Sequence, residues 1–337
     1  LQTSSYFING LIKLLNNASK DNRHIAQLFT TSTESNNNSS FLMSLTRNLI
    51  IPDATMRSST LDLLCIIMEK FQGVSIPQIV NECKIVEQIP LTLQNGRTLT
   101  ARIRSMGEEF TKTEPTEIIT NIFLKHLFGL LTVRFAPVWE GIREILPSIY
   151  KKNSSLTWNL LAKFLTVNDS DYILTYPDDI MEDEVDELLW ESRISRLENI
   201  LKNFTLTWTR YSCLKSSIVN ISKERRAQLE YPPHVRAESL KLMLLVPQLA
   251  ESHSKDIVPY LFNEDEISVI FQGEDIHNAN KWSDIERNSL LKVFGKFNNS
   301  KNIYKSDDVF QRLLNLLSGR TVEVQKLALS AIFPYKI

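Results

Sequence analysis

Histidine and cysteine are the side chains that most often ligate metal ions or pair as nucleophile and base, and in this chain they are scattered. The histidines are His24, His126, His234, His253 and His277. The cysteines are Cys65, Cys83 and Cys213. None of these residues stands at the spacing of a zinc site, and the odd number of cysteines favours reduced thiols in an intracellular protein. We therefore expect no bound metal ion.

Glycine-dependent catalytic motifs are absent from the chain. It holds only 9 glycines among 337 residues, and none of them forms a Gly-x-Ser-x-Gly elbow, a phosphate-binding loop or a dinucleotide fingerprint. The sequence therefore predicts a protein that is not an enzyme, with no catalytic residues, no cofactor and no small-molecule substrate. No apolar run reaches the roughly 18 residues of a membrane span, so no membrane association is expected.

One segment, residues 168–191, is strongly acidic. Eight acidic side chains lie between Asp178 and Glu191. Such a cluster could bind a basic partner or a cation, but its spacing fits no EF-hand loop. We interpret it as a solvated insertion loop.

Basic side chains cluster at two places, in a chain whose total charge is almost balanced at 38 Lys+Arg against 39 Asp+Glu. The clustered residues are Arg97, Arg102, Arg104, Lys223, Arg225 and Arg226. Either cluster could contact RNA phosphates through salt-dependent attraction, and the alternative is a solvated helix end. The tryptophans lie in apolar stripes and are expected in the core rather than as platforms for stacking on bases.

The elements that would position these side chains are helices, and residues 306–336 show this most clearly. Phe310, Leu313, Leu314 and Leu317 follow the spacing of one helical face. We expect Ser306 to cap the start of this helix.

A second helix is expected directly after the first. We expect Gly319 to end the first helix in the left-handed conformation and Thr321 to cap the second. Ala328 and Ala331 in the second helix are small enough for close helix approach. One such hairpin cannot bury its own apolar faces, so neighbouring pairs must cover them.

The second helix begins with a pattern that recurs along the chain: a β-branched residue or Met, a polar residue, two variable residues, a small residue and an aliphatic residue. Its copies begin at Met56, Val133, Val235, Ile285 and Val324, the Val133 copy being the loosest. The last three starts lie about 40 and about 50 residues apart, close to the length of one HEAT unit. This repetition favours HEAT-type helix pairs over an irregular helical domain.

Further helical periodicity fills most of the chain. Helices are expected at 6–15, 24–29, 41–51, 56–71, 77–89, 99–110, 117–132, 137–150, 155–167, 187–208, 235–249, 256–270 and 284–297. Residues 31–40 and 91–96 are expected to be loops, although the Asn-Gly pair at 95–96 would also suit a hairpin. The fold class is therefore all-α: a HEAT/armadillo-like α-solenoid of roughly seven to nine stacked helix pairs over residues 1–337.

Two stretches resemble one known family. The first is LFGLLTVRFAPVW at residues 127–139, and the second combines residues 290–297, 299–304 and VQKLALSAIFPYK at 324–336. Both resemble segments of the down-regulated-in-metastasis (DRIM) family, the family of the U three snoRNA-associated protein twenty of the small-subunit processome. The resemblance covers roughly residues 123–336, and the Asn-rich loops suggest a fungal member.

The resemblance implies a non-enzymatic scaffold of the nucleolar small-subunit processome, or 90S pre-ribosome, needed for pre-rRNA processing and 18S rRNA maturation. Its implied partners are other processome proteins, pre-rRNA and U three snoRNA. The family's chains are several times longer, so we interpret this chain as a fragment. Two alternatives stay open: a HEAT-type nuclear transport receptor and the helical arm of a giant HEAT-containing kinase.

Overall fold

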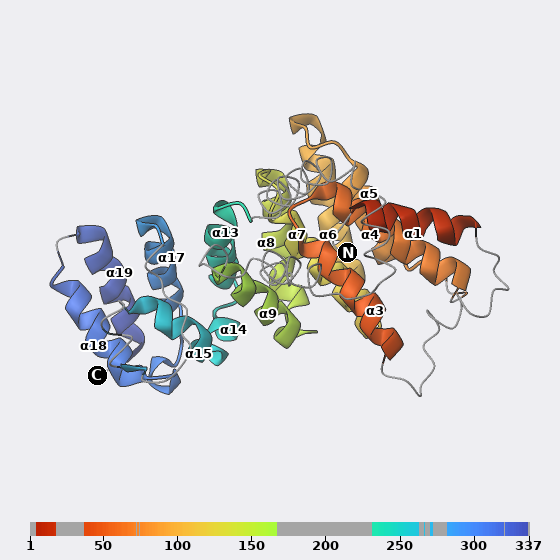
Figure 1. The fold of residues 1–337 in the computed structure, drawn as a ribbon. Helices are drawn as coiled ribbons and strands as arrows, with labels where there is room; N and C mark the ends of the chain where they lie inside the picture. Colours follow the sequence, from red (N-terminus) through yellow and green to blue (C-terminus); the bar gives the residue numbers. More distant parts are fainter. Residues whose placement is uncertain are drawn as a thin grey trace, which may run out of the picture. The chain divides into compact units, whose positions relative to one another are not determined.

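The computed structural model describes residues 5–17, 37–71, 73, 75–166, 231–262, 266, 270–271, 282–319 and 321–335. The chain divides into two units: Leu1–Val167 with Tyr231–Ile337, and Asn168–Glu230. All described residues belong to the first unit, which Figure 1 shows as a set of helices. Across these residues the regular structure is helical, as the sequence predicts, and no strand is present.

The first half of the described chain contains eight α-helices and three short helices of other types. They are α1 (Ser5–Asn17), α3 (Asn37–Thr46), the 3-10 turn η1 (Arg47–Ile50), α4 (Ala54–Ile66), the π-helix η2 (Ile67–Phe71), α5 (Gln78–Gln88), the 3-10 turn η3 (Leu93–Asn95), α6 (Gly96–Lys112), α7 (Glu117–Leu130), α8 (Ala136–Ile149) and α9 (Ser154–Leu165).

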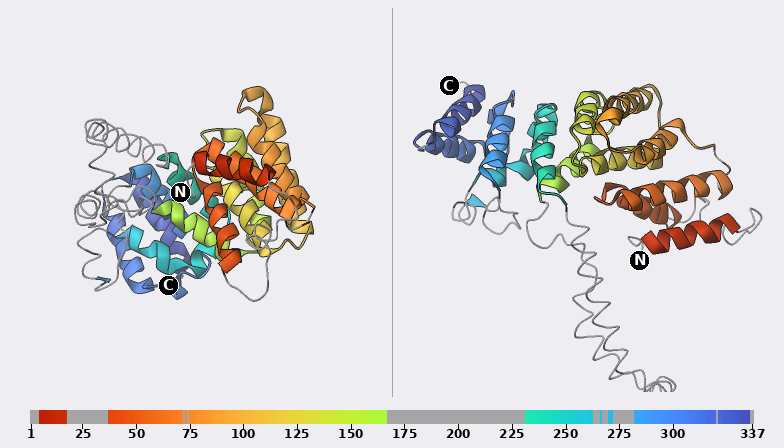
Figure 2. Two further views of the ribbon diagram at one scale, coloured as in Figure 1. Left: turned by 45° about the vertical axis from the view of Figure 1, so that its right-hand side comes forward. Right: turned by 90° about the horizontal axis from the view of Figure 1, so that it is seen from above.

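The described residues after 230 continue with helices. They are α13 (His234–Met243), α14 (Pro247–Ser252), α15 (Ser254–Ile257), the 3-10 turn η5 (Val258–Leu261), α17 (Asp284–Phe294), the 3-10 turn η7 (Ser300–Asn302), α18 (Ser306–Leu317), α19 (Val322–Ile332) and the 3-10 turn η8 (Phe333–Tyr335). Helices α18 and α19 lie against each other in both views of Figure 2, as the sequence predicts for this pair.

Several helices begin at a side chain that accepts hydrogen bonds from the first turn. Asp53 precedes α4 and accepts from the backbone N–H of Thr55 at 2.8 Å. Asn153 accepts from the N–H of Leu156 at 3.1 Å before α9, and Ser283 forms a reciprocal capping box with Glu286 before α17. Each cap satisfies N–H groups that have no partner within the helix, and so fixes where the helix starts.

Helices α6 and α8 form a close parallel pair, in which residues 96, 103 and 107 of α6 lie against residues 137, 141 and 145 of α8. A Cβ atom added to Gly107 on α6 would lie 2.7 Å from Ile145 on α8, and one added to Gly141 on α8 would lie 3.1 Å from Ile103 on α6. Ile145 of α8 therefore packs against Gly107, and Ile103 of α6 packs against Gly141. The absence of side chains at these two positions lets the backbones approach closely.

Aromatic side chains connect the helices at the core. Phe110 of α6 stacks on Phe123 of α7 with ring centroids 4.7 Å apart, and Phe128 of α7 lies 6.1 Å from Phe164 of α9. All four rings are buried. Trp158 and Trp282 are buried and Trp139 is half-buried, which confirms the expected core role for these three. Trp190 and Trp208 lie outside the described residues.

Three details were predicted at the ends of α18 and α19, of which two are wrong and the third, the position of Thr321, is confirmed. Ser306 is the first helical residue rather than the cap: Lys305 occupies the cap position with φ 50°, and the Ser306 hydroxyl donates to the carbonyl of Ser300. Gly319 is not left-handed, because α18 already ends at Ser318 in a right-handed conformation. Thr321 does precede α19, but its side chain makes no capping hydrogen bond.

The helix predicted for 235–249 is interrupted. Helix α13 ends at Met243 and α14 starts at Pro247. Proline disfavours a helical conformation at the residue before it, and Val246 accordingly has φ −129° and ψ 56°.

The Val133 copy of the repeat pattern is also wrong as a helix start, since Val133 lies in the turn before α8. The other four copies begin at the second or third residue of α4, α13, α17 and α19.

Two more boundaries differ from the prediction. The loop expected at 31–40 is helical from Asn37 onward. The helix expected at 256–270 contains only α15 and η5 before Phe262, because Pro259 lacks the N–H that would continue an α-helix. The loop expected at 91–96 holds the 3-10 turn η3, and no hairpin forms there. The helices expected at 24–29 and 187–208 and the acidic insertion at 168–191 lie outside the described residues.

Candidate functional site

The polar residue in the second position of the repeat pattern is buried in three of the four helices that carry the pattern. Arg57 of α4 is 0% exposed, Arg236 of α13 7% and Glu286 of α17 8%, whereas Gln325 of α19 is half-buried. A buried charge is costly unless it is paired and hydrogen-bonded. The groups on other helices that pair with these buried charges therefore show how the pattern joins one helix to the next.

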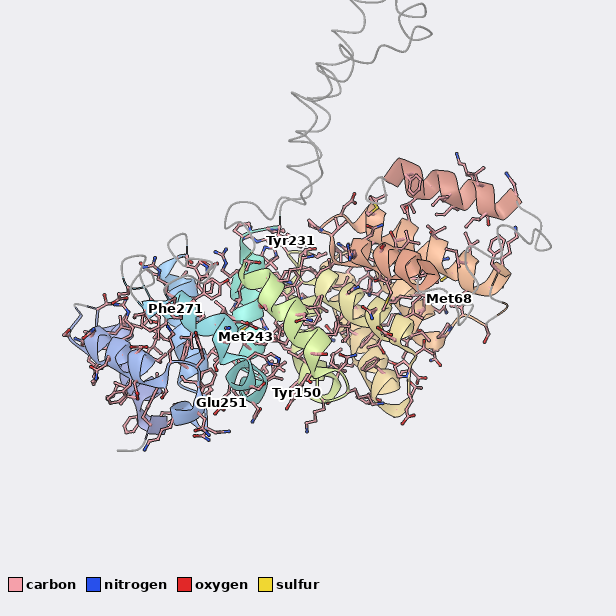
Figure 3. All side chains as sticks on the ribbon, turned by 60° about the horizontal axis from the view of Figure 1, so that its bottom comes forward. Met68, Tyr150, Tyr231, Met243, Glu251 and Phe271 are labelled. Carbon is pink, nitrogen blue, oxygen red and sulfur yellow. The ribbon has the colours of Figure 1, made fainter. Side chains whose placement is uncertain are left out.

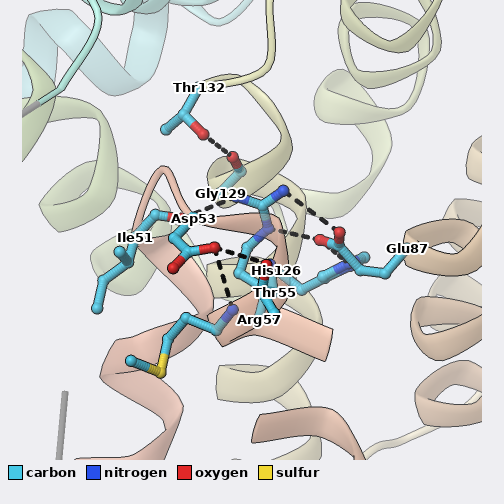
Figure 4. Close-up of polar contacts among 9 residues, drawn as sticks. Ile51, Asp53, Thr55, Arg57, Glu87, His126, Gly129 and Thr132 are labelled. Atoms are coloured by element: carbon cyan, nitrogen blue, oxygen red, sulfur yellow. Dashed lines mark hydrogen bonds and ion pairs between the residues drawn. The ribbon is translucent and has the colours of Figure 1, made fainter. Parts of the chain in front are cut away.

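Arg57 lies at the centre of a buried ionic cluster that joins α4, α5 and α7 (Figure 4). Its guanidinium donates to both carboxylate oxygens of Glu87, at 2.5 Å from Nε and 3.3 Å from the second terminal nitrogen. It also donates to the carbonyl of Ile51 at 2.8 Å. His126 Nε2 lies 3.1 Å from Glu87 Oε1. We call Arg57, Glu87 and His126 the buried triad.

The triad holds Glu87 in its ionised form. Burial alone would raise the pKa of this carboxyl, but the hydrogen bond from His126 and the charge of Arg57 outweigh it and lower the pKa to about 2. The side chains of Arg57 and Glu87 are 1% and 3% exposed. No substrate could reach these groups, so their role is to connect three helices and not to perform acid–base chemistry.

Arg236 makes an equivalent connection among α9, α13 and α17. Its Nε donates to the carbonyl of Leu165 at 2.9 Å, one terminal nitrogen lies 3.7 Å from Glu286, and its guanidinium lies 5.0 Å from the ring centre of Trp282. The carbonyl of Leu165 is one of the last of α9, so the arginine satisfies a group left unpaired at a helix end. Such charge-assisted contacts fix the register of one helix pair on the next.

Glu251, labelled in Figure 3, connects α14 to the turn before η7. Its carboxylate accepts from the backbone N–H groups of Asn298 and Asn299, at 3.1 Å and 2.7 Å. These contacts bridge almost fifty residues of sequence and tie the two segments together.

The predicted arginines of α6 lie on different sides of the helix. Arg102 pairs with Glu82 of α5 at 2.8 Å, and Arg104 pairs with Glu144 of α8 through two hydrogen bonds. Their mutual hydrogen bond raises the pKa of Arg104 and lowers that of Glu144. Arg97 is exposed. The structure therefore does not bring the three side chains onto one surface.

The second predicted basic cluster, Lys223, Arg225 and Arg226, lies outside the described residues. Contact with RNA phosphates stays a prediction for all six residues.

The buried triad was not predicted from the sequence, because its members are far apart in the chain. The signal that could have indicated it was the charged residue repeated at the second position of the pattern.

Metal and membrane sites are absent from the part of the chain that the structure describes. No group of three His, Cys, Asp or Glu side chains there is arranged to hold a metal ion. None of the described helices is both long and apolar enough to cross a membrane. Cys65 and Cys83 are buried free thiols whose pKa values are raised by burial.

Comparison with known proteins assigns the chain to a family. The profile of the family described as U3 small nucleolar RNA-associated protein 20, N-terminal, matches residues 281–337. U3 small nucleolar RNA-associated protein 20 of Saccharomyces cerevisiae is 40% identical over 301 residues, which are 88% of this chain and 12% of the relative. The protein of the same name in Schizosaccharomyces pombe is 21% identical over 308 residues, again 12% of its length.

The chain thus spans about an eighth of the length of the curated relatives that it matches. The resemblance inferred from residues 127–139 and 290–336 is confirmed by these matches. The chain belongs to the family of U3 small nucleolar RNA-associated protein 20.

Proposed function

We propose that the described helices form a HEAT-like α-solenoid. The contacts between helices support this arrangement: α4 packs on α5, α5 on α6, and α6 on α8, while α7, α9, α13, α17 and α19 contact one another in that order. Helices therefore pack mainly on neighbours close in sequence, as in repeat proteins. The charged second position of the repeat pattern joins successive helix pairs through Arg57 and Arg236.

We propose that the chain acts as a structural scaffold in small-subunit ribosome assembly and carries out no catalysis itself. The observation that supports this function is the 40% identity to the yeast protein, whose name states its association with U3 small nucleolar RNA. A helical-repeat array suits such a role because it offers side chains along an extended series of helices, each fixed by its neighbours. It would hold protein and RNA partners at set separations.

The implied partners are other small-subunit processome proteins, pre-rRNA and U3 snoRNA, and the implied location is the nucleolus. Depletion of the protein from cells tests this function. We expect 18S rRNA to fall relative to the large-subunit rRNA, with accumulation of unprocessed precursor. Restoring the protein should restore the ratio. An unchanged ratio after complete depletion would contradict the proposal.

A further inference from the structure

Three cations that the sequence did not single out lie on helices that contact one another. They are Arg47 at the start of η1, Lys125 in the second half of α7 and Lys163 in the last turn of α9. Helix α7 packs against α3, η1 and α9; α3, α7 and α9 are labelled in Figure 1. Lys125 Nζ donates to Thr46 Oγ1 at 2.8 Å, which places its ammonium beside the residue that precedes Arg47. We call Arg47, Lys125 and Lys163 the basic face.

The basic face has almost no negative charge of its own. The segments α3, η1 and α9 contain no carboxylate, and α7 contains only Glu117. Glu117 stands eight residues before Lys125, about 12 Å away along the helix axis. No ion pair is found for any of the three cations among the described residues. This contrasts with Arg102 and Arg104, which both have carboxylate partners.

Carboxylates on the helices packed around the basic face are held elsewhere. On α5, Glu82 pairs with Arg102 and Glu87 with Arg57. On α13, Glu238 accepts from Arg143 and Lys241. On α14, Glu251 accepts from two backbone N–H groups. These four carboxylates are thus engaged with other groups, and none of them is paired with Arg47, Lys125 or Lys163.

The three cations also influence one another. Desolvation by the surrounding helices, together with the charges of Arg47 and Lys163, lowers the pKa of Lys125 to about 8. Desolvation likewise lowers the pKa of Lys163, with a further contribution from Arg47. Repulsion among these like charges raises the free energy of the unliganded protein, and a bound anion would relieve that repulsion.

We propose that Arg47, Lys125 and Lys163 together bind the phosphate backbone of an RNA strand. Arg47 and Lys163 are exposed and Lys125 is half-buried, so all three residues are at least partly open to solvent, from which a phosphate group would approach. Arginine and lysine contacts to phosphate fix the position of a nucleic acid without reading its sequence. The choice of RNA as the source of the anion rests on the function proposed above.

Binding of a single-stranded RNA oligonucleotide to the purified 337-residue chain tests this inference. The chain and its Arg47→Gln/Lys125→Gln/Lys163→Gln variant are compared over a range of salt concentrations. Each phosphate contact to a single strand contributes about 0.7 to the slope of log K against log salt, so the variant should lose about 2 from that slope. A variant that keeps the slope of the native chain would overturn the proposal.

A control variant carries the same loss of three charges at another place. Lys292, Lys296 and Lys301 are exposed, and their replacement by glutamine should leave the slope unchanged. An equal loss in both variants would mean that only net charge matters, and would contradict a defined site. If the triple variant of the basic face fails to fold, the Arg47→Gln/Lys163→Gln variant alters only exposed side chains and should lose about 1.4 from the slope.

A second measurement follows Lys125 itself. In the chain with isotopically methylated lysines, saturating RNA should raise the pKa of Lys125 back toward its usual range, since phosphate favours the charged ammonium. An acidic peptide that produces this rise where RNA does not would overturn RNA as the ligand. Because both measurements use purified protein, their failure would leave the rRNA test of the scaffold function unaffected.

Discussion

Replacing Glu87 by glutamine should strongly destabilise the fold. The substitution keeps the size of the side chain but removes the negative charge that faces Arg57, whose side chain is 1% exposed. Arg57 would then retain the carbonyl of Ile51 and a neutral amide as partners. Leaving one member of a buried ion pair without its counter-charge costs about 3–5 kcal/mol. That is a large share of the roughly 5–15 kcal/mol by which domains are stable.

The matched control is Glu82→Gln on the same helix, α5. Glu82 also pairs with an arginine, but the side chains of Glu82 and Arg102 are 21% and 37% exposed. Water can solvate the arginine after the change, so the expected loss is below about 1 kcal/mol. Urea unfolding measures both free energies, and hydrogen exchange of the α5 amides shows whether the loss is local. Equal losses for the two variants would refute the role assigned to burial.

A double variant separates the cost of leaving Arg57 without a counter-charge from the other effects of Glu87→Gln. Adding Arg57→Met to Glu87→Gln removes the unpaired guanidinium. The double variant should therefore have a free energy of unfolding equal to or higher than that of Glu87→Gln alone. If instead the two losses add, Arg57 and Glu87 act independently, and the pairing in the structure does not explain their effect.

Three further predictions concern the same region. Because the pKa of folded Glu87 is lowered to about 2, its stabilising effect is complete above about pH 5 and is lost as the pH falls toward 2. The difference in unfolding free energy between the native chain and Glu87→Gln should therefore shrink between pH 5 and pH 3, and an unchanged difference would contradict this. Gly129→Ala would place a Cβ atom 2.0 Å from the carbonyl oxygen of Leu49 and should cost about 1–3 kcal/mol in thermal or urea unfolding, whereas Gly10→Ala, with nothing within 4 Å, should be neutral or stabilising. Asp53→Ala should cost about 1 kcal/mol through loss of the α4 cap, as measured by the urea midpoint, while Asp53→Asn should restore most of it.

The helices could be predicted from the sequence because their apolar faces repeat at helical spacing. Helices α5, α7, α8, α9 and α17 begin within two residues of the predicted positions. Boundaries set by a single residue were harder to predict. Pro247 divides a continuous apolar stripe into two helices, and Lys305 takes the cap position expected for Ser306. In each case a local backbone conformation outweighed the side-chain pattern.

The contacts between helices could not be predicted in the same way. The buried triad joins residues separated by 30 and 39 positions, and nothing in the local sequence of Glu87 distinguishes it from the exposed glutamates. The basic face has a similar origin, since Arg47, Lys125 and Lys163 are isolated in sequence and come together only through the packing of η1, α7 and α9. The arginines of α6 were conspicuous as a cluster, yet two of them serve as partners of carboxylates.

The most direct test of the scaffold function is to identify the RNA that is bound to the protein in cells. The tagged full-length protein is purified from cell extract after ultraviolet crosslinking, and the bound RNA is sequenced. Enrichment of U3 snoRNA and small-subunit pre-rRNA over other abundant nucleolar small RNAs is the predicted result. Recovery of these RNAs at the level of an untagged control would contradict the function proposed for this chain.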